Sequence, residues 1–316
     1  MAMLGPSQPL TIDLRFLDRP GVVAAFLLRG EGEAALVDLG PASTVETLLA
    51  AVTEAGTPLE EVRHLLVTHV HLDHAGAAGV LLQRLPWARL YVHELGAPHL
   101  IDPTKLIASA TRIYGSLMKK LWGTILPVPA DRLVVLGDGQ RLYLAGHRID
   151  VLYTPGHALH HVSFRDLDSG EIFTGDVAGV RLPGCSFVRP PTPPPDLDLD
   201  AWDASLDRLA GLQAPAFYVA HFGRCVDTPA HLAELRTHLR DWEQVVLAGM
   251  RAGQDRTTIA ATMQRLGDEE LIRRQADEEV RSRYEMASAY AMNVAGYERY
   301  LRKRYPDLAP PAIQAP

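Results

Sequence analysis

The first two thirds of the sequence predict an α+β fold, and the last third predicts an all-helical region. As far as residue 220, short apolar runs bounded by turn residues alternate with segments of helical spacing. From about Thr228 onward the spacing is helical throughout, with no strand pattern. The 316 residues, 47% of them hydrophobic, are enough for one large core plus an appendage. We therefore place one domain over residues 1–228 and a helical C-terminal region over residues 229–316.

The beginning of the chain is expected to form an antiparallel meander of strands at 11–17, 22–28 and 34–37. Residues 30–35, which read GEGEAA, superficially match a dinucleotide-binding fingerprint. That motif has to open a helix, whereas this segment leads directly into another strand. It is therefore expected to be a hairpin turn.

The remaining elements follow from the same patterns. Helices are expected at 43–54, 75–84, 201–209 (with Asp200 as the N-cap), 231–250, 256–266 and 268–304. Strands are expected at 63–67, 90–93, 132–136, 141–144, 149–153, 161–164, 171–173 and 217–220. Two further segments are unusual: a long helical insertion at 97–124, and a proline tract at 183–195 that suits neither a helix nor a central strand.

The composition excludes several classes of protein. A net charge of −7 and a pI of about 6.0 argue against a nucleic-acid partner. The cysteines Cys185 and Cys225 are too few for a disulfide framework and favour a reducing compartment. Residues 1–10 lack the pattern of a signal peptide, and no apolar run approaches the roughly 18 residues that a membrane span needs. We therefore predict a cytoplasmic protein with no membrane partner.

The most informative segment is 68–76, which reads THVHLDHAG. In an extended chain alternate side chains lie on one side, so His69 and His71 can bind one metal ion together. Asp73 and His74, where the chain turns into a helix, then face a second position nearby. Imidazoles with a carboxylate suit zinc, iron or manganese better than calcium or magnesium. The segment therefore predicts a metal centre.

Three more candidates each follow a predicted strand on a short loop. They are His157 in TPGH (154–157), Asp176 in TGD (174–176) and His221 in AHFG (220–223). Ligands at strand ends are held in place by a rigid sheet.

In this order of motifs, over about residues 10–225, the chain resembles the metallo-β-lactamase superfamily. The resemblance implies an αββα sandwich of two mixed sheets, with the site at one edge and the C-terminal helices as an appendage. It also implies two divalent metal ions, with zinc as the first choice and iron or manganese as alternatives. Metal 1 would be held by His69, His71 and His157, and metal 2 by Asp73, His74 and His221, with Asp176 bridging the two.

Two such ions would lower the pKa of a shared water toward roughly 7 and give a hydroxide that attacks an acyl carbon, with Asp73 shuttling its proton. The bridging Asp176 and the absent signal peptide disfavour a true β-lactamase. The C-terminal helices favour the glyoxalase II-like thioesterases over the lactonases, but no matching basic cluster for glutathione is found. We therefore predict a hydrolase of a small thioester or lactone. The alternatives are an iron-dependent oxidoreductase of the persulfide dioxygenase type, and a non-catalytic metal-binding protein.

Four secondary expectations concern the surroundings of this site. His160 or His161 is a candidate to orient a ligand or touch the substrate. The insertion 97–124 fits either a lid or, as the sequence favours, a packing helix with a solvated basic face. The proline tract fits either a pocket wall or, more simply, a stiff linker. The C-terminal helices are expected either to lie over the edge of the sheets that carries the site or to form a homodimer contact.

Overall fold

The computed structural model describes residues 8–30 and 32–308, which form two compact units. Among the described residues, the first unit holds 8–30 and 32–154 together with 160–175 and 214–226. The second holds 155–159, 176–213 and 227–308. The expected absence of a signal peptide falls mainly on residues 1–7, which lie outside the described residues. The proposed domain boundary at residue 228 stays a prediction.

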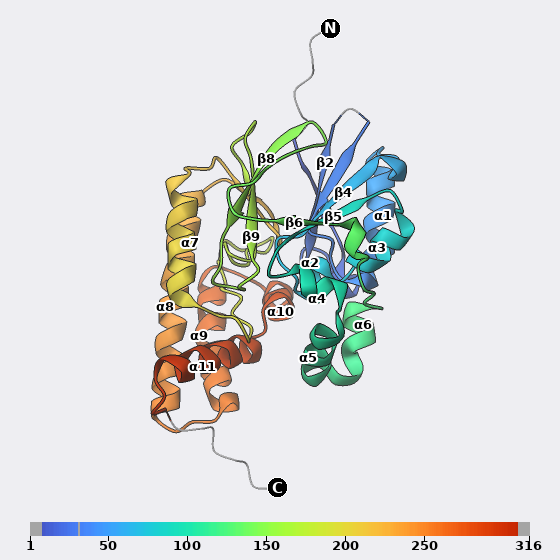
Figure 1. Ribbon diagram of the computed structural model, residues 1–316. Helices are drawn as coiled ribbons and strands as arrows, with labels where there is room; N and C mark the ends of the chain where they lie inside the picture. The colour runs from blue at the N-terminus through green and yellow to red at the C-terminus, as the bar shows by residue number, and fades with distance from the viewer. Residues whose placement is uncertain (1–7, 31, 309–316) are drawn as a thin grey trace. The chain divides into compact units, whose positions relative to one another are not determined.

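Among the described residues the first unit contains two six-stranded sheets (Figure 1). The first sheet runs in chain order: β1 (Leu10–Asp13), β2 (Ala24–Arg29), β3 (Ala34–Val37), β4 (Val62–Leu66), β5 (Arg89–His93) and β6 (Leu133–Leu136). The first three strands pair antiparallel, as predicted, and the others are parallel. Because β2 pairs directly with β3, the expected hairpin is confirmed. The crossover helices α1 (Val45–Glu54) and α3 (Ala78–Arg84) lie beside this sheet, and the short α2 (Leu72–Ala75) precedes α3.

The second sheet has the order β12-β11-β10-β9-β8-β7. Its strands are β7 (Arg141–Leu144), β8 (His147–Tyr153), β9 (Val162–Asp166), β10 (Ile172–Gly175), β11 (Phe217–Val219) and β12 (Gly223–Cys225). Strand β12 was not predicted, since three residues are too few to show an alternating pattern. It pairs antiparallel with β11 immediately after a tight turn.

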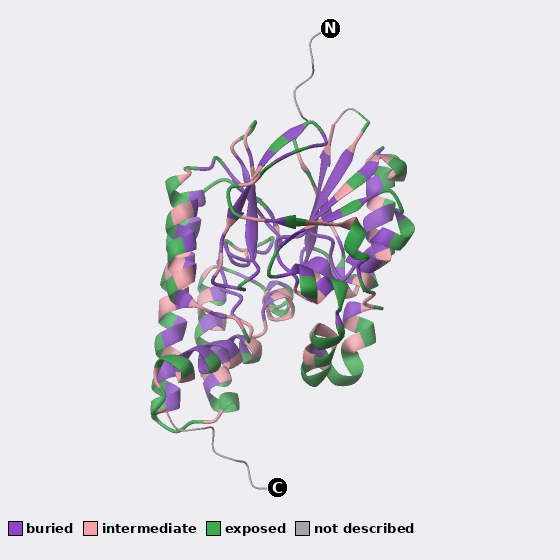
Figure 2. Cartoon of the chain, in the orientation of Figure 1, coloured by how far each residue is buried: buried purple, intermediate pink, exposed green. Residues whose placement is uncertain are grey.

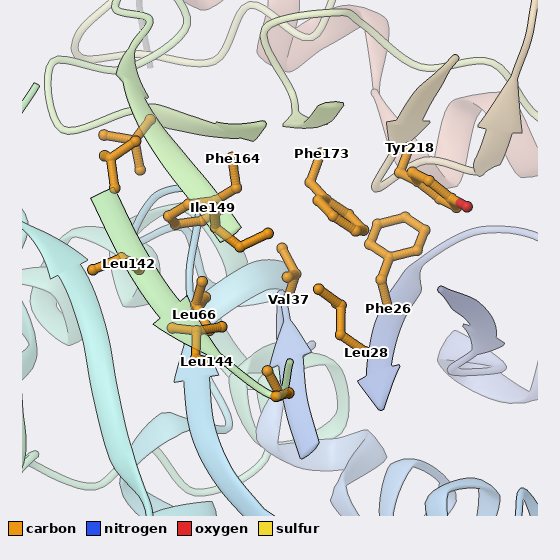
Figure 3. Close-up of a cluster of buried hydrophobic side chains, with 14 of the residues drawn as sticks. Phe26, Leu28, Val37, Leu66, Leu142, Leu144, Ile149, Phe164, Phe173 and Tyr218 are labelled. Atoms are coloured by element: carbon orange, nitrogen blue, oxygen red, sulfur yellow. The ribbon is translucent and has the colours of Figure 1, made fainter. Parts of the chain in front are cut away.

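The core of the first unit lies between the inner faces of the two sheets (Figure 3). The rings of Phe26, from the first sheet, and Phe173, from the second, have their centroids 5.5 Å apart. Tyr218 stacks on Phe173 at 4.8 Å. Val37 and Leu66 end their strands inside this cluster. Two face-to-face sheets of mixed pairing, with helices beside them, are the architecture that the sequence predicts.

The second unit contains five α-helices in its described part: α7 (Leu199–Gly211), α8 (Thr228–Arg251), α9 (Arg256–Arg273), α10 (Glu278–Ala287) and α11 (Tyr290–Arg304). The N-cap prediction for α7 was wrong: Asp198, not Asp200, accepts hydrogen bonds from the backbone N–H groups of Asp200 and Ala201, because the helix starts at the buried Leu199. No described helix has both the length and the hydrophobicity that a membrane crossing requires.

The predicted helix 268–304 was wrong, because the structure has three helices in this region. Gln275 has a left-handed backbone (φ 63°) that ends α9, and the carboxylate of Asp277 then caps α10 at Val280 N. The gap expected at residue 267 is instead inside α9. A Cβ atom on Gly267 would lie 1.9 Å from Tyr290 Oη, so the glycine allows α11 to approach closely.

Three other expected elements were also divided or shortened. The strand expected at 11–17 ends at Asp13, whose carboxylate accepts from Arg15 N (2.9 Å) and Gly21 N (2.8 Å) and so forms a turn. The helix 75–84 is divided between α2 and α3. The insertion 97–124 consists of α4 (Ala97–Ile101), α5 (Thr104–Tyr114) and α6 (Met118–Trp122), and its surface is mostly exposed along α5 (Figure 2). The proline tract lies outside helices and strands, as expected, apart from one bridge at Arg189.

Candidate metal centre

Asp38 organises the loop that carries the histidine motif. It follows β3, is buried, and has a left-handed backbone (φ 52°) that aspartate tolerates. Its Oδ1 accepts hydrogen bonds from Thr68 N (2.9 Å) and Thr68 Oγ1 (3.0 Å), and its Oδ2 lies 3.1 Å from His74 Nδ1. Sequence reasoning missed this residue. The available signal was an aspartate at the end of a fully apolar strand.

His69 and His71 come together just beyond β4, as the extended spacing predicts. His69 Nε2 and His71 Nδ1 are 3.0 Å apart and share a hydrogen bond. The other nitrogen of His69, Nδ1, lies 3.0 Å from Thr68 Oγ1. His69 is fully buried and His71 is partly exposed, so this pair has a buried side and an open side.

Asp73, His74 and His221 form a second group, in which one ligand atom from each residue lies within 4.8 Å of the others. Asp73 Oδ2 is 3.4 Å from His221 Nε2 and 3.8 Å from His74 Nε2. Both imidazoles are buried, whereas the Asp73 carboxylate is 23% exposed. The rings of His69 and His74 are 4.0 Å apart, which places this group next to the His69–His71 pair.

The far side of each imidazole in this group faces an acceptor. His221 Nδ1 donates to Val22 O at 2.7 Å, and His74 Nδ1 faces the Asp38 carboxylate. A proton on Nδ1 leaves a lone pair on Nε2 of the neutral ring, directed toward Asp73. Since two lone pairs facing a carboxylate oxygen repel it, the arrangement calls for a cation among these atoms. Histidine held at Nδ1 by a carbonyl or carboxylate is the usual arrangement around a bound metal, so the donor set fits a divalent ion.

The second unit, described by itself, carries His157 and Asp176. His157 Nε2 and Asp176 Oδ2 are 3.4 Å apart, and His157 Nδ1 donates to Pro191 O at 2.8 Å. The turn before His157 requires glycine: Gly156 has φ 134°, and a Cβ atom there would lie 2.4 Å from Trp202 Cα. The His157 imidazole therefore has the same hydrogen-bonding arrangement as those of His74 and His221: Nδ1 faces an oxygen acceptor, and Nε2 faces a carboxylate.

His160 and His161 lie beside the motif in the first unit. Their rings are 6.2 and 5.1 Å from that of His69. His160 Nδ1 accepts a hydrogen bond from Val70 N at 3.3 Å, between the two motif histidines. His160 therefore supports the backbone that carries His69 and His71.

The insertion packs against the first unit through α6. Trp122 is buried, stacks on Phe16 at 5.7 Å and meets Tyr114 edge to face at 5.1 Å. Burial and, to a lesser extent, the negative charge of Asp73 raise the pKa of the Tyr114 phenol to about 12. The C-terminal end of α5 therefore lies close enough to Asp73 for the charge of this carboxylate to affect the Tyr114 phenol.

Comparison with known proteins identifies a matching family model and several relatives. A family model described as "Metallo-beta-lactamase superfamily" matches residues 18–221. A hydroxyacylglutathione hydrolase of Aeromonas hydrophila is 28% identical over 197 residues, which cover 62% of this chain and 59% of that protein. An atrochrysone carboxyl ACP thioesterase of Aspergillus fumigatus is 27% identical over 67% of this chain and 40% of its own length. The match thus spans less than two thirds of either relative.

A solved structure is similar over nearly the whole chain. The metallo-beta-lactamase family protein TTHA1429 from Thermus thermophilus has a TM-score of 0.69 and 25% identity, covering 94% of this chain and 93% of that one.

Proposed function

Since the chain belongs to the metallo-β-lactamase superfamily, we propose that it is a metal-dependent hydrolase acting on a small thioester or lactone. One observation carries the proposal: His74 and His221, each held at Nδ1, direct Nε2 toward the partly exposed carboxylate of Asp73. The two relatives named above, a hydroxyacylglutathione hydrolase and a thioesterase, favour a thioester.

The full ligand set is part of the proposal. It consists of His69, His71 and His157 for one ion, Asp73, His74 and His221 for the other, and Asp176 as the bridge. Within the second unit, the proposal is supported by the 3.4 Å distance between His157 Nε2 and Asp176 Oδ2.

When bound, the ions supply an activated water and polarise the carbonyl of the substrate. Imidazole and carboxylate ligands suit zinc first, with iron and manganese as alternatives. The protein's own groups do the rest. The exposed edge of Asp73 accepts a hydrogen bond from the attacking water and then its proton. That proton passes to the sulfur or oxygen that leaves when the acyl bond breaks.

Other expectations from the sequence remain predictions. These are a cytoplasmic location, the absence of nucleic-acid and membrane partners, and a homodimer formed through the C-terminal helices. The oxidoreductase and the non-catalytic metal-binding protein remain as alternative functions, and both are outcomes of the test below.

The decisive experiment measures metal content and proton release together. The metal-loaded protein is placed in a pH-stat with glutathione thioesters, coenzyme A thioesters and lactones. We expect one class to be hydrolysed and a chelator to abolish the reaction. His221→Ala should lose both metal and activity. His64→Ala is the matched control, because His64 pairs with Tyr91 and Glu33 and lies outside the cluster.

Bound metal without hydrolysis of any substrate would contradict the proposal. Oxygen uptake with one iron per chain would then identify the oxidoreductase, and no reaction at all would identify the binding protein. Full metal content and activity in His221→Ala would contradict the ligand assignment itself.

A further inference from the structure

A basic cleft lies in the second unit. None of the residues that line it is a proposed metal ligand. It has a volume of about 560 Å³ and is lined by Pro194, the start of α9 and one face of α11. Its α11 residues are Ala295, Glu298, Arg299, Arg302 and Lys303. They are spaced i, i+3, i+4, i+7 and i+8, which places all five side chains on one face of the helix.

The charges that line this cleft are unbalanced. Arg256, Arg299, Arg302 and Lys303 contribute four cations, and Glu298 contributes one carboxylate. Glu298 is buried and already accepts from Arg256, at 2.8 Å from its Nε and 2.7 Å from its Nη2. Over residues 8–30 and 32–308, neither Arg299 nor Lys303 forms an ion pair. Because the whole chain has a net charge of −7, this concentration of positive charge is a local feature.

The cleft is also partly preformed. Arg299 Nε donates to Pro195 O at 3.1 Å and Arg256 donates to Glu298, so two of the guanidinium groups each have a hydrogen-bond partner within the unit. Arg256 is the first residue of α9, but Asp255 already caps that helix end through Thr258 N. The side-chain cations, rather than the helix dipole, therefore provide the attraction for an anion.

We propose that this cleft binds a small ligand that carries phosphate groups. Guanidinium groups match the geometry of phosphate oxygens, and several cations in one hollow suit an anion with more than one charge. The volume falls within the range of small-molecule sites, about 300–1,000 Å³, and is large enough for a nucleoside diphosphate. The inference is independent of the proposed hydrolase activity, because it uses none of the residues assigned to metal.

The test is isothermal titration calorimetry of the full chain at low salt, with pyrophosphate and ADP as probes. We expect saturable binding to one site, weakened by added salt. The double variant Arg299→Gln/Lys303→Gln should raise the Kd about tenfold or more. The matched control is Arg265→Gln/Arg273→Gln, which removes two charges from α9, where both residues pair with glutamates of their own helix.

Each outcome decides the proposal. Binding of pyrophosphate alone identifies a phosphate site, and tighter binding of ADP shows that the nucleoside is also contacted. Absence of binding by both probes, an equal loss in the control variant, or equally strong competition by sulfate would overturn it. Circular dichroism of each variant establishes that the fold is retained.

Discussion

Replacing Asp38 separates its role in the fold from its role at the candidate metal centre. In Asp38→Asn the side-chain oxygen can still accept from Thr68 N and Thr68 Oγ1, as Oδ1 does now. The new amide N–H₂, however, faces His74 Nδ1 where a carboxylate oxygen lies at 3.1 Å. The imidazole must then accept at Nδ1 and carry its proton on Nε2, the atom directed toward Asp73. In that tautomer Nε2 carries the proton, so it has no lone pair with which to bind a metal.

The expected magnitude follows from these contacts. Loss of such an outer partner typically lowers metal affinity about 10- to 100-fold, which corresponds to about 1.4–2.7 kcal/mol. Asp38→Ala should cost more stability. It leaves Thr68 N–H and His74 Nδ1–H buried without an acceptor, at about 1–3 kcal/mol each. The Thr68 hydroxyl can turn toward His69 Nδ1, 3.0 Å away, so we expect a loss of about 2–6 kcal/mol in total.

The assay is competition with a chromophoric chelator, combined with urea denaturation of the metal-free protein. Asp166→Asn is the matched control. Asp166 and His147 form another buried pair, 2.9 Å apart, outside the cluster. The Asp166→Asn variant should be less stable than the unchanged protein but bind metal with the same affinity. If Asp38→Asn bound metal as tightly as the unchanged protein, the tautomer argument would be refuted.

Two further substitutions test the packing and the pH dependence. Gly156→Ala should destabilise the second unit by at least about 2 kcal/mol, since its Cβ would clash with Trp202 in a backbone of φ 134°. An unchanged midpoint of urea denaturation would disprove this. The control is Gly211→Ala, because the space around Gly211 is open. Burial lowers the pKa of the His231 imidazole, so the unfolded chain takes up a proton there before the folded one does. The free energy of unfolding should therefore decrease as the pH falls below about 6.5. His231→Gln should reduce this dependence of the unfolding free energy on pH, measured from denaturation curves recorded from pH 8 to 5. An identical pH dependence in the variant would count against the role of His231.

The sequence alone was sufficient for the features that depend on neighbours in the chain. The two-residue spacing of His69 and His71 places both rings on one side of an extended segment, wherever that segment lies. The meander of β1–β3 and the apolar strands were equally readable, because alternation and turn residues are local signals. The order of the histidine and aspartate motifs along the chain gave the resemblance to a family, and that resemblance implied the αββα architecture.

The tertiary structure decided what depends on residues far apart in sequence. Asp38 holds the motif from a position 30 residues before Thr68, and no local pattern records that distance. Gly267 looked like a helix end but lies inside α9, where its missing side chain makes room for Tyr290. Strand β12 exists because β11 offers it hydrogen bonds. In each case the deciding energy comes from packing or pairing between distant segments, which sequence spacing does not encode.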